Sequence, residues 1–345
     1  MSESHHTVFE HYGTSIVVAD RTVPFEETIE RFGEALSKKC RFQTRARRFY
    51  DTVWIADCYT DYVQSALFRK YEGPLMEGIA LRTMGKGLSK QQVLAGAMAE
   101  AVERISFFDA LASGRETPIY ELTSDVELVP SSMKVSDVPH LNDSANGVSA
   151  GNTVLECVFH GLLEMHEHLD VGRHFYWPGL EHRQFIDPNL TGFSPRVVEK
   201  MLAVAVPGEN EKVTTVHAVV CPKDLGPLVR TCAHLDGRMA LQRAFNETVQ
   251  SHKTRFVSDL QTFDAEIALW DLPNHFTDDL ITDIQVVLSG MKNSVYVQDW
   301  TDPEMQIPVL RPFSLNTAEH ERDHAMIETY VHRIMVDSGN YIVWT

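Results

Sequence analysis

Two segments of the chain carry glutamates at spacings that gather their carboxylates on one face of a helix. Glu100 and Glu103 stand three residues apart, which places them within about 60° of each other around an α-helix. A second segment places four side chains within about 80° of one another: Glu156, His160, Glu164 and Glu167. Exposed helices usually interleave Lys or Arg four residues away, yet this face contains neither. Crowded carboxylates without cations therefore indicate a ligand that supplies positive charge.

Hard divalent cations are the ligands that such faces favour. Mg²⁺ takes oxygen donors, commonly one or two carboxylates, and completes its octahedron with water and substrate phosphate. The two acidic helices therefore predict a nucleoside triphosphate bound through more than one Mg²⁺. The alternative interpretation of each face is a solvated helix surface, where glutamate is common.

A transition-metal site is a further interpretation of the second helix. Its ligands would come from His160, Glu164, His166 and His168. His166 and His168 are two residues apart and point about 200° apart on a helix, so both cannot reach one ion. The spacing argues against this site.

Glycine-rich segments precede both acidic helices. Gly85-Lys86-Gly87 stands before the first, and Ala150-Gly151-Asn152 before the second. Glycine turns that lead into helix N-termini expose backbone N–H groups and the positive end of the helix dipole, which together favour anions. Lys86 is therefore expected to meet a phosphate, although the segment differs from the phosphate-loop pattern.

The elements that position these residues follow from hydrophobic periodicity. Strands are expected at short β-branched runs, residues 14–18, 52–56, 78–83, 213–221, 294–297 and 341–344. Helices are expected at residues 25–38, 90–112, 154–169, 195–205, 237–253, 278–289 and 318–336. This mixture predicts an α/β or α+β fold. A polar loop at residues 123–146 is the one plausible soft boundary.

Local signals mark the ends of the acidic helices. Ser89 with Gln92, and Thr153 with Glu156, have the spacing of capping boxes at helix starts. Gly114 is expected to end the first helix.

Composition limits the classes of protein to which the chain can belong. The chain has 345 residues, 43% of them hydrophobic, which predicts one large or two intimate domains with a sizeable core. A net charge of −17 argues against nucleic-acid binding. No apolar run suits a membrane span and no signal peptide is present, so a cytoplasmic protein is expected. The five cysteines are scattered and are expected to be reduced thiols.

These motifs together resemble the YcaO family. The resemblance is carried by the Gly85-Lys86-Gly87 segment, by the glutamates at 100 and 103 followed by Arg104, and by the spacing of Asn152 from the three glutamates after it. A third segment runs from Ala240 to Ser251. The resemblance extends from about residue 78 to residue 252 and frames the whole chain.

The resemblance implies a fold and an activity. The fold would be mixed sheets flanked by helices, with a Glu-lined site for ATP and Mg²⁺ between two helices. Residues 1–77 would form an N-terminal α/β segment integrated with a core at residues 78–345. Family members use ATP to phosphorylate a peptide backbone amide oxygen, so that a nucleophile attacks the amide carbon and phosphate leaves. A neighbouring Cys, Ser or Thr gives an azoline, sulfide a thioamide and an amine an amidine.

Carried over position by position, the resemblance implies nucleotide or Mg²⁺ contacts for nine residues, and it names no catalytic side chain. The nine are Lys86, Glu100, Glu103, Asn152, Glu156, Glu164, Glu167, His168 and His252. The five glutamates among them would be the Mg²⁺ ligands.

Three positions depart from the family pattern. Gly96 stands where many members have Ser, and His168 and His252 each replace an Arg. The replacement exchanges a permanent bidentate phosphate donor for a side chain that is largely neutral at pH 7. Substitute phosphate contacts are expected from Arg104, Arg243, Lys253 or Arg255.

Two hypotheses therefore stand. The first is an enzyme that makes an azoline or thioamide in a ribosomally synthesised, bacteriocin-like precursor peptide or in a protein. The second is a catalytically degenerate subunit that binds nucleotide or peptide and scaffolds a modification complex. The end of the chain, residues 340–345, differs from the proline-rich tail common in azoline-forming members. A separate leader-peptide-binding or sulfide-delivering partner is expected, and the family suggests a homodimer.

Overall fold

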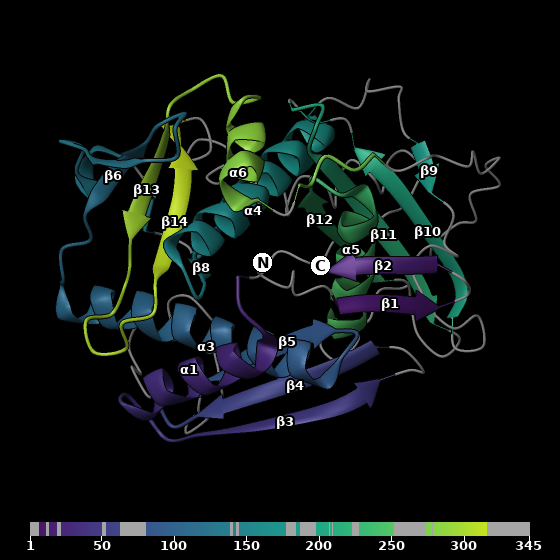
Figure 1. Cartoon of the computed structure of the whole chain (residues 1–345), viewed down its shortest axis with the longest axis horizontal. Helices are drawn as coiled ribbons and strands as arrows, with labels where there is room; N and C mark the ends of the chain where they lie inside the picture. The colour runs from purple at the N-terminus through teal and green to yellow at the C-terminus, as the bar shows by residue number, and fades with distance from the viewer. Residues whose placement is uncertain are drawn as a thin grey trace.

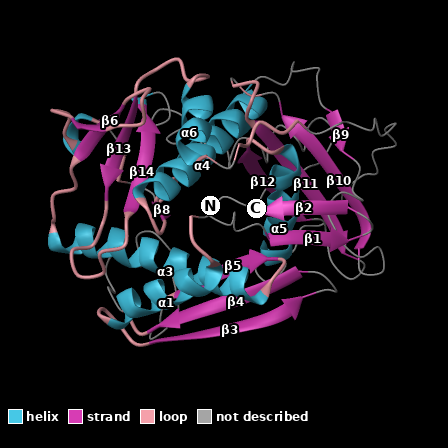
Figure 2. Cartoon of the chain, viewed as in Figure 1, coloured by secondary structure: helices cyan, strands magenta, loops and turns pink. Residues whose placement is uncertain are grey.

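The structure is a computed structural model. It describes residues 7–11, 14–18, 22–49, 53–62, 81–138, 141–142, 145–176, 184–186, 198–206, 208, 210–222, 228–251, 273–277 and 279–315. Three larger antiparallel sheets lie at the periphery, and Figure 2 shows helices on their inner sides, facing one another. The predicted mixed α/β class is confirmed. In the part of the chain described, no helix has the length and apolar composition needed to cross a bilayer.

The first sheet supports the first acidic helix. Its strand order is β3 (Phe42–Phe49), β4 (Val53–Thr60), β5 (Arg82–Gly87). Helix α3 (Lys90–Ser113) packs on β4 and β5, and α1 (Phe25–Ser37) packs against α3 (Figure 1). Half of the residues of α3 are buried, and all of these but Ser106 are apolar, so hydrophobic burial rather than helix propensity holds the helix in place.

Gly85 makes the close packing of β5 on α3 possible. A Cβ at this position would lie 1.8 Å from the carbonyl oxygen of Val93. Gly96 on α3 faces the same contact, and a Cβ there would meet the Cα of Gly85 at an ordinary 3.6 Å. The strand and helix therefore approach at a glycine on each side, and only Gly85 is sterically required.

The second sheet carries the other acidic helix. Helix α4 (Val154–Tyr176) packs along this sheet, and α6 (Leu280–Leu288) packs on α4. The strand order is β7 (Leu128–Pro130), β6 (Ile119–Leu122), β13 (Val295–Asp299), β14 (Val309–Ser314), β8 (Ser149–Ala150).

The region of the expected soft boundary belongs to this second sheet. Residues 123–146 were expected as a polar loop, but β7 lies within them and pairs with β6, and a 3₁₀ turn spans Val135–Asp137. Three residues of strand are too few to give a periodic signal, so the pairing depends on the neighbouring strand.

The third sheet is covered by the third inner helix. Its order is β12 (Leu228–His234), β11 (Thr214–Pro222), β10 (Val198–Val206), β9 (Gln184–Ile186), and a separate hairpin joins β1 (Thr7–His11) to β2 (Thr14–Val18). Helix α5 (Gly237–Ser251) packs on β11 and β12.

Two predicted elements are wrong. The helix expected at 195–205 is strand β10, because pairing with β9 and β11 overrides the helix propensity of its Met, Leu, Ala and Lys residues. The Gly85-Lys86-Gly87 segment was expected as a turn, but it is the end of β5. Elements expected at 318–336 and 341–344 lie outside the described residues, as does the first half, residues 78–80, of the strand expected at 78–83.

Candidate functional site

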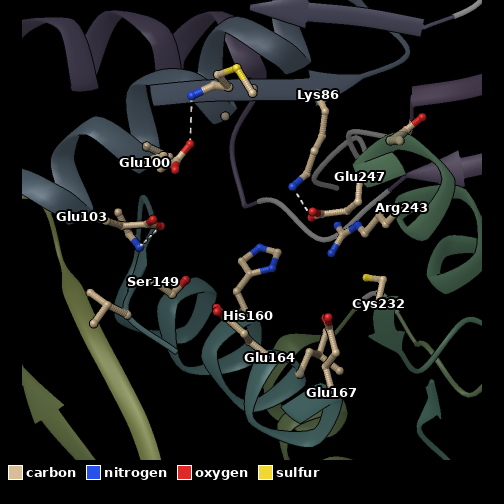
Figure 3. A pocket seen from close by; sticks show the side chains of 18 of the residues that line it. Lys86, Glu100, Glu103, Ser149, His160, Glu164, Glu167, Cys232, Arg243 and Glu247 are labelled. Atoms are coloured by element: carbon tan, nitrogen blue, oxygen red, sulfur yellow. Dashed lines mark hydrogen bonds and ion pairs between the residues drawn. The ribbon is translucent and has the colours of Figure 1, made fainter. Parts of the chain in front are cut away.

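A cavity of about 550 Å³ lies where α3, α4 and α5 face one another. Strands β5, β8 and β12 complete its wall. Figure 3 shows glutamates of α3 and α4 around it, with a lysine, an arginine and a further glutamate on the opposite side. Six of the nine predicted site residues line this cavity: Lys86, Glu100, Glu103, Glu164, Glu167 and His168.

Local hydrogen bonds fix where α3 begins and ends. Ser89 Oγ accepts a hydrogen bond from the Gln92 N–H at 3.1 Å, as predicted for the N-cap. The Gln92 side chain accepts from the Leu88 N–H at 2.9 Å, one residue before the N-cap rather than at it. Gly114 ends the helix at φ 64°. These interactions fix the ends of the helix that carries Glu100 and Glu103.

Backbone donors hold the two carboxylates of α3. Glu100 Oε2 accepts from the Met84 N–H of β5 at 2.9 Å, and Glu103 Oε1 accepts from the Ala150 N–H of β8 at 2.8 Å. Arg104 lies 3.8 Å from Glu100. Each glutamate thus joins α3 to a strand from a different sheet, which positions its carboxylate within the cavity wall.

Removal from bulk solvent perturbs both carboxylates. It raises the pKa of Glu103 from 4.5 to about 8, and the charges of Glu100 and Glu164 add to this effect. It also raises the pKa of Glu100. A carboxylate in this position is therefore stabilised in its charged form only when a cation joins it.

The carboxylates of α4 face those of α3. Removal from solvent raises the pKa of Glu167 to about 7, with added repulsion from Glu247 and Glu164, and Thr231 Oγ1 donates a hydrogen bond to Glu167. Removal from solvent also raises the pKa of Glu164, but the hydrogen bond and charge of His168, which lies 3.7 Å away, bring it below its ordinary value. His168 thus offsets the negative charge of one of the four cavity glutamates, Glu164.

The third wall comes from β5 and α5. Lys86 Nζ forms an ion pair with Glu247, and Arg243 stands one helical turn before Glu247. Burial lowers the pKa of Lys86, but the charge and hydrogen bond of Glu247 outweigh this and raise it overall. Cys232 also lines the cavity, and burial raises the pKa of its thiol, so the thiol stays protonated.

Sequence reasoning missed Glu247 as a site residue. It lies within the third segment of the family resemblance, four residues after Arg243 on α5. That i, i+4 spacing was a signal that could have found it. His160 lines the cavity as well; the sequence placed it on the acidic face of the second helix but not among the nine expected site residues.

The structure does not bring Asn152 and Glu156 to the cavity. Glu156 is fully buried, and its Oε2 accepts from the Asn152 N–H at 2.7 Å and from Asn152 Nδ2 at 3.0 Å. Its Oε1 accepts from Thr22 Oγ1 at 2.5 Å and from the Thr22 N–H. The predicted cap is half confirmed, because Thr153 Oγ1 accepts from the Glu156 N–H at 3.2 Å. His252, Lys253 and Arg255 lie outside the described residues.

The donor set of the cavity fits Mg²⁺ held jointly by protein and phosphate. Within the described residues, no three His, Cys, Asp or Glu side chains converge on a point that could hold a metal ion. The four cavity glutamates of α3 and α4 instead surround a nucleotide-sized space, and Mg²⁺ commonly takes only one or two carboxylates besides phosphate and water.

Comparison with known proteins identifies the family. Residues 117–313, more than half of the 345 residues, match the family model described as YcaO cyclodehydratase, ATP- and Mg²⁺-binding. This chain belongs to the YcaO family. The resemblance found in its sequence is confirmed, and so are ATP and Mg²⁺ as cofactors. The YcaO match includes α4 and α5, while the site residues of β5 and α3 precede it.

Solved structures show the YcaO fold over most of the chain. YcaO from Methanopyrus kandleri bound with AMPPCP and Mg²⁺ aligns at 17% identity and a TM-score of 0.65, covering 88% of this chain and 94% of that one. A heterocyclase in complex with substrate and cofactor aligns at 16% identity and a TM-score of 0.60, covering 85% of this chain. This chain spans about half, 52%, of that heterocyclase. The comparison with curated proteins gives no matching relative.

Proposed function

We propose that this protein uses Mg²⁺ and ATP to phosphorylate a backbone amide oxygen in a ribosomally made precursor peptide or in a protein. The observation that carries the proposal is the cavity itself, where four glutamates on two helices face Lys86 and Arg243. Carboxylates and cations on opposite walls suit a polyphosphate held on one side through Mg²⁺ and on the other directly. Membership of the YcaO family supports the same chemistry.

The charged side chains of the cavity would bind two different partners, Mg²⁺ and phosphate. Glu100, Glu103, Glu164 and Glu167 would hold Mg²⁺, which when bound neutralises phosphate charge in the transfer. Lys86 and Arg243 would contact phosphate oxygens directly. Lys86 must exchange its partner Glu247 for phosphate, so nucleotide entry opens the β5–α5 ion pair.

Positioning is the main catalytic requirement in this proposal. An amide oxygen is a poor nucleophile, so holding it close to the γ-phosphorus supplies most of the rate. The backbone bonds from Met84 and Ala150 keep two carboxylates rigid, which avoids reorganisation during the reaction. The product is an azoline when a neighbouring side chain attacks the amide carbon, and a thioamide when sulfide attacks.

The assembly is also part of the proposal. Residues 78–345 would form the core, with 1–77 integrated into it, as the contacts of α1 with α3 and of Thr22 with Glu156 support. A leader-peptide-binding or sulfide-delivering protein would present the substrate to a YcaO homodimer. The cytoplasm, where ATP is available, is the proposed location.

Peptide-dependent phosphate release tests the enzyme. The protein with its cognate peptide, its partner protein, Mg²⁺ and ATP should release phosphate, and Glu103→Gln should abolish this release while Glu121→Gln, exposed on β6, leaves it intact. Mass spectrometry then separates loss of water from exchange of oxygen for sulfur. Absence of ADP and AMP under all peptide and partner conditions would contradict the proposal.

A scaffold role is the second candidate. It is favoured by His168, which stands where the family has Arg and already engages Glu164 at 3.7 Å. Calorimetry with Mg²⁺ and ATP distinguishes the two: binding without turnover supports a scaffold, and turnover eliminates it.

A further inference from the structure

Strand β3 is an edge strand of the first sheet in the described structure. The sheet order β3, β4, β5 leaves its outer side without a described partner strand. Figure 1 shows it at the lower margin of the molecule. An edge strand presents a row of backbone N–H and C=O groups that can pair with a further extended chain.

This edge is unusually basic. Arg45, Arg47 and Arg48 fall within four residues and are all exposed, in a chain whose net charge is −17. In the described part of the chain, no carboxylate forms an ion pair with any of them. Alternation places Arg45 and Arg47 on one face of the strand and Arg48 on the other, so both faces of an added strand would meet positive charge.

The register connects this edge to the cavity. Arg47 pairs with Ile55 of β4, and Ile55 pairs with Lys86 of β5. The three residues form one row across the sheet, from the exposed edge to a cavity-lining lysine. Strands lie about 4.8 Å apart, so a chain added to β3 would lie about 15 Å from β5, a distance that roughly five extended residues can span.

We propose that β3 binds an extended acidic segment of the substrate peptide by strand addition, leaving the residues beyond that segment to reach the cavity. The segment pairs its backbone with β3 and its carboxylates with Arg45, Arg47 and Arg48. This proposal rests on the proposed peptide substrate, but the binding step requires neither ATP nor turnover.

Other occupants fit the edge less well. Two copies of β3 paired with each other would bring two sets of three arginines together, and like charges directly opposite destabilise a sheet. A nucleic acid would meet only a short basic strand on a strongly acidic chain, whereas affinity for its backbone needs many phosphate contacts.

Fluorescence anisotropy with synthetic peptides tests the surface without nucleotide. The probe is a labelled peptide of alternating Glu and Thr, as long as the 8 residues of β3. The same peptide with Gln for Glu tests charge, and one with alternate N-methylated amides tests backbone pairing. We expect binding of the first peptide and about tenfold weaker binding of each of the other two. Equal binding of the N-methylated peptide overturns strand addition.

Charge-reversing variants locate the binding surface. Arg45→Glu combined with Arg47→Glu should weaken binding of the Glu-Thr peptide about tenfold, while Lys212→Glu, exposed before β11, should not. Circular dichroism melting checks that each variant folds. Unchanged peptide affinity in the double variant overturns the proposal, as does tighter binding of polyuridylate or an arginine-dependent dimer in sedimentation. Phosphate release measured separately shows whether the proposed function fails while peptide binding stands.

Discussion

At the residue scale, the cavity glutamates are defined by what surrounds them. Removal from bulk solvent raises the pKa of Glu103 to about 8, the charges of Glu100 and Glu164 add to this rise, and the hydrogen bond from the Ala150 N–H partly opposes it. Glu167 has a pKa of about 7 for similar reasons. Both groups are therefore partly protonated at neutral pH until a cation binds, and binding of Mg²⁺ must release protons.

The stability of the nucleotide-free protein should consequently fall as pH rises. The folded pKa of Glu103, about 8, exceeds its ordinary 4.5, so the folded state binds the extra proton. The contribution of this proton to the free energy of unfolding is complete below pH 4.5 and is lost as pH rises toward 8. Between pH 4.5 and pH 8, the melting temperature of Glu103→Gln should fall by a few degrees less than that of the wild type, as measured by calorimetry. A slope equal to that of wild type would contradict the assigned pKa.

His168 should hold phosphate more weakly at pH 8 than an arginine would. Histidine is largely neutral there, whereas arginine keeps its charge and can donate two hydrogen bonds to phosphate. His168→Arg should therefore restore a permanent charge and tighten ATP binding about tenfold at pH 8. Isothermal titration measures this affinity. His275→Arg, exposed outside the cavity, is the matched control; the same gain in that variant would point to nonspecific attraction.

At the element scale, the start of α4 separates two roles that its glutamates share in sequence. Glu156 closes the turn between β8 and α4 by accepting from Asn152 and Thr22, whereas Glu164, two turns further, lines the cavity. Gly151 belongs to the same turn, since a Cβ there would come within 2.7 Å of Glu156 Cβ. The first glutamate therefore positions the helix that presents the second.

Two matched substitutions on α4 should separate these roles. Glu156→Gln places an amide donor among groups that already donate, which should cost about 1–3 kcal/mol of stability. It should leave Mg²⁺ and ATP affinity little changed in the folded protein. Glu164→Gln should have the opposite effects, weakening nucleotide affinity with little loss of stability. Melting temperature and calorimetric affinity measured on both variants check this. Loss of affinity alone in Glu156→Gln would return that residue to the metal site.

At the scale of the whole molecule, the cavity exists because three sheets present helices inward. Helix α3 comes from the first sheet, α4 from the second and α5 from the third (Figure 1). The Lys86 and Glu247 ion pair joins the first and third, and the bond of Glu103 to Ala150 joins the first and second. Nucleotide at the centre would contact all three units.

Mg²⁺ and ATP together should therefore stabilise the protein as a unit. At a ligand concentration a hundred times Kd, the gain is about 2.7 kcal/mol, and the melting temperature should rise accordingly. ATP with a chelator should give little of this shift, because the carboxylates then face phosphate without a cation. Differential scanning fluorimetry compares the two conditions. An equal shift without Mg²⁺ would contradict the assignment of the four cavity glutamates.

The sequence by itself determined what depends on neighbours along the chain. Period 3.6 placed the glutamates of α3 and α4 on shared faces, and local hydrogen bonding fixed the ends of α3 at Ser89 and Gly114. The glycine-rich segment before α3 pointed to Lys86, and the family resemblance added the third segment. Caps and helix faces are decided within a few residues, so they can be found without the fold.

Only the tertiary structure decided what depends on distant contacts. Glu156 turns away from the cavity because Thr22, 134 residues away, donates to it, and Glu247 enters because α5 packs beside β5. Residues 198–206 became a strand because β9 and β11 pair with them. Side chains of one type on one helix face are equivalent in sequence. Their roles diverge because packing buries some of them against donors and leaves others facing a charged cavity.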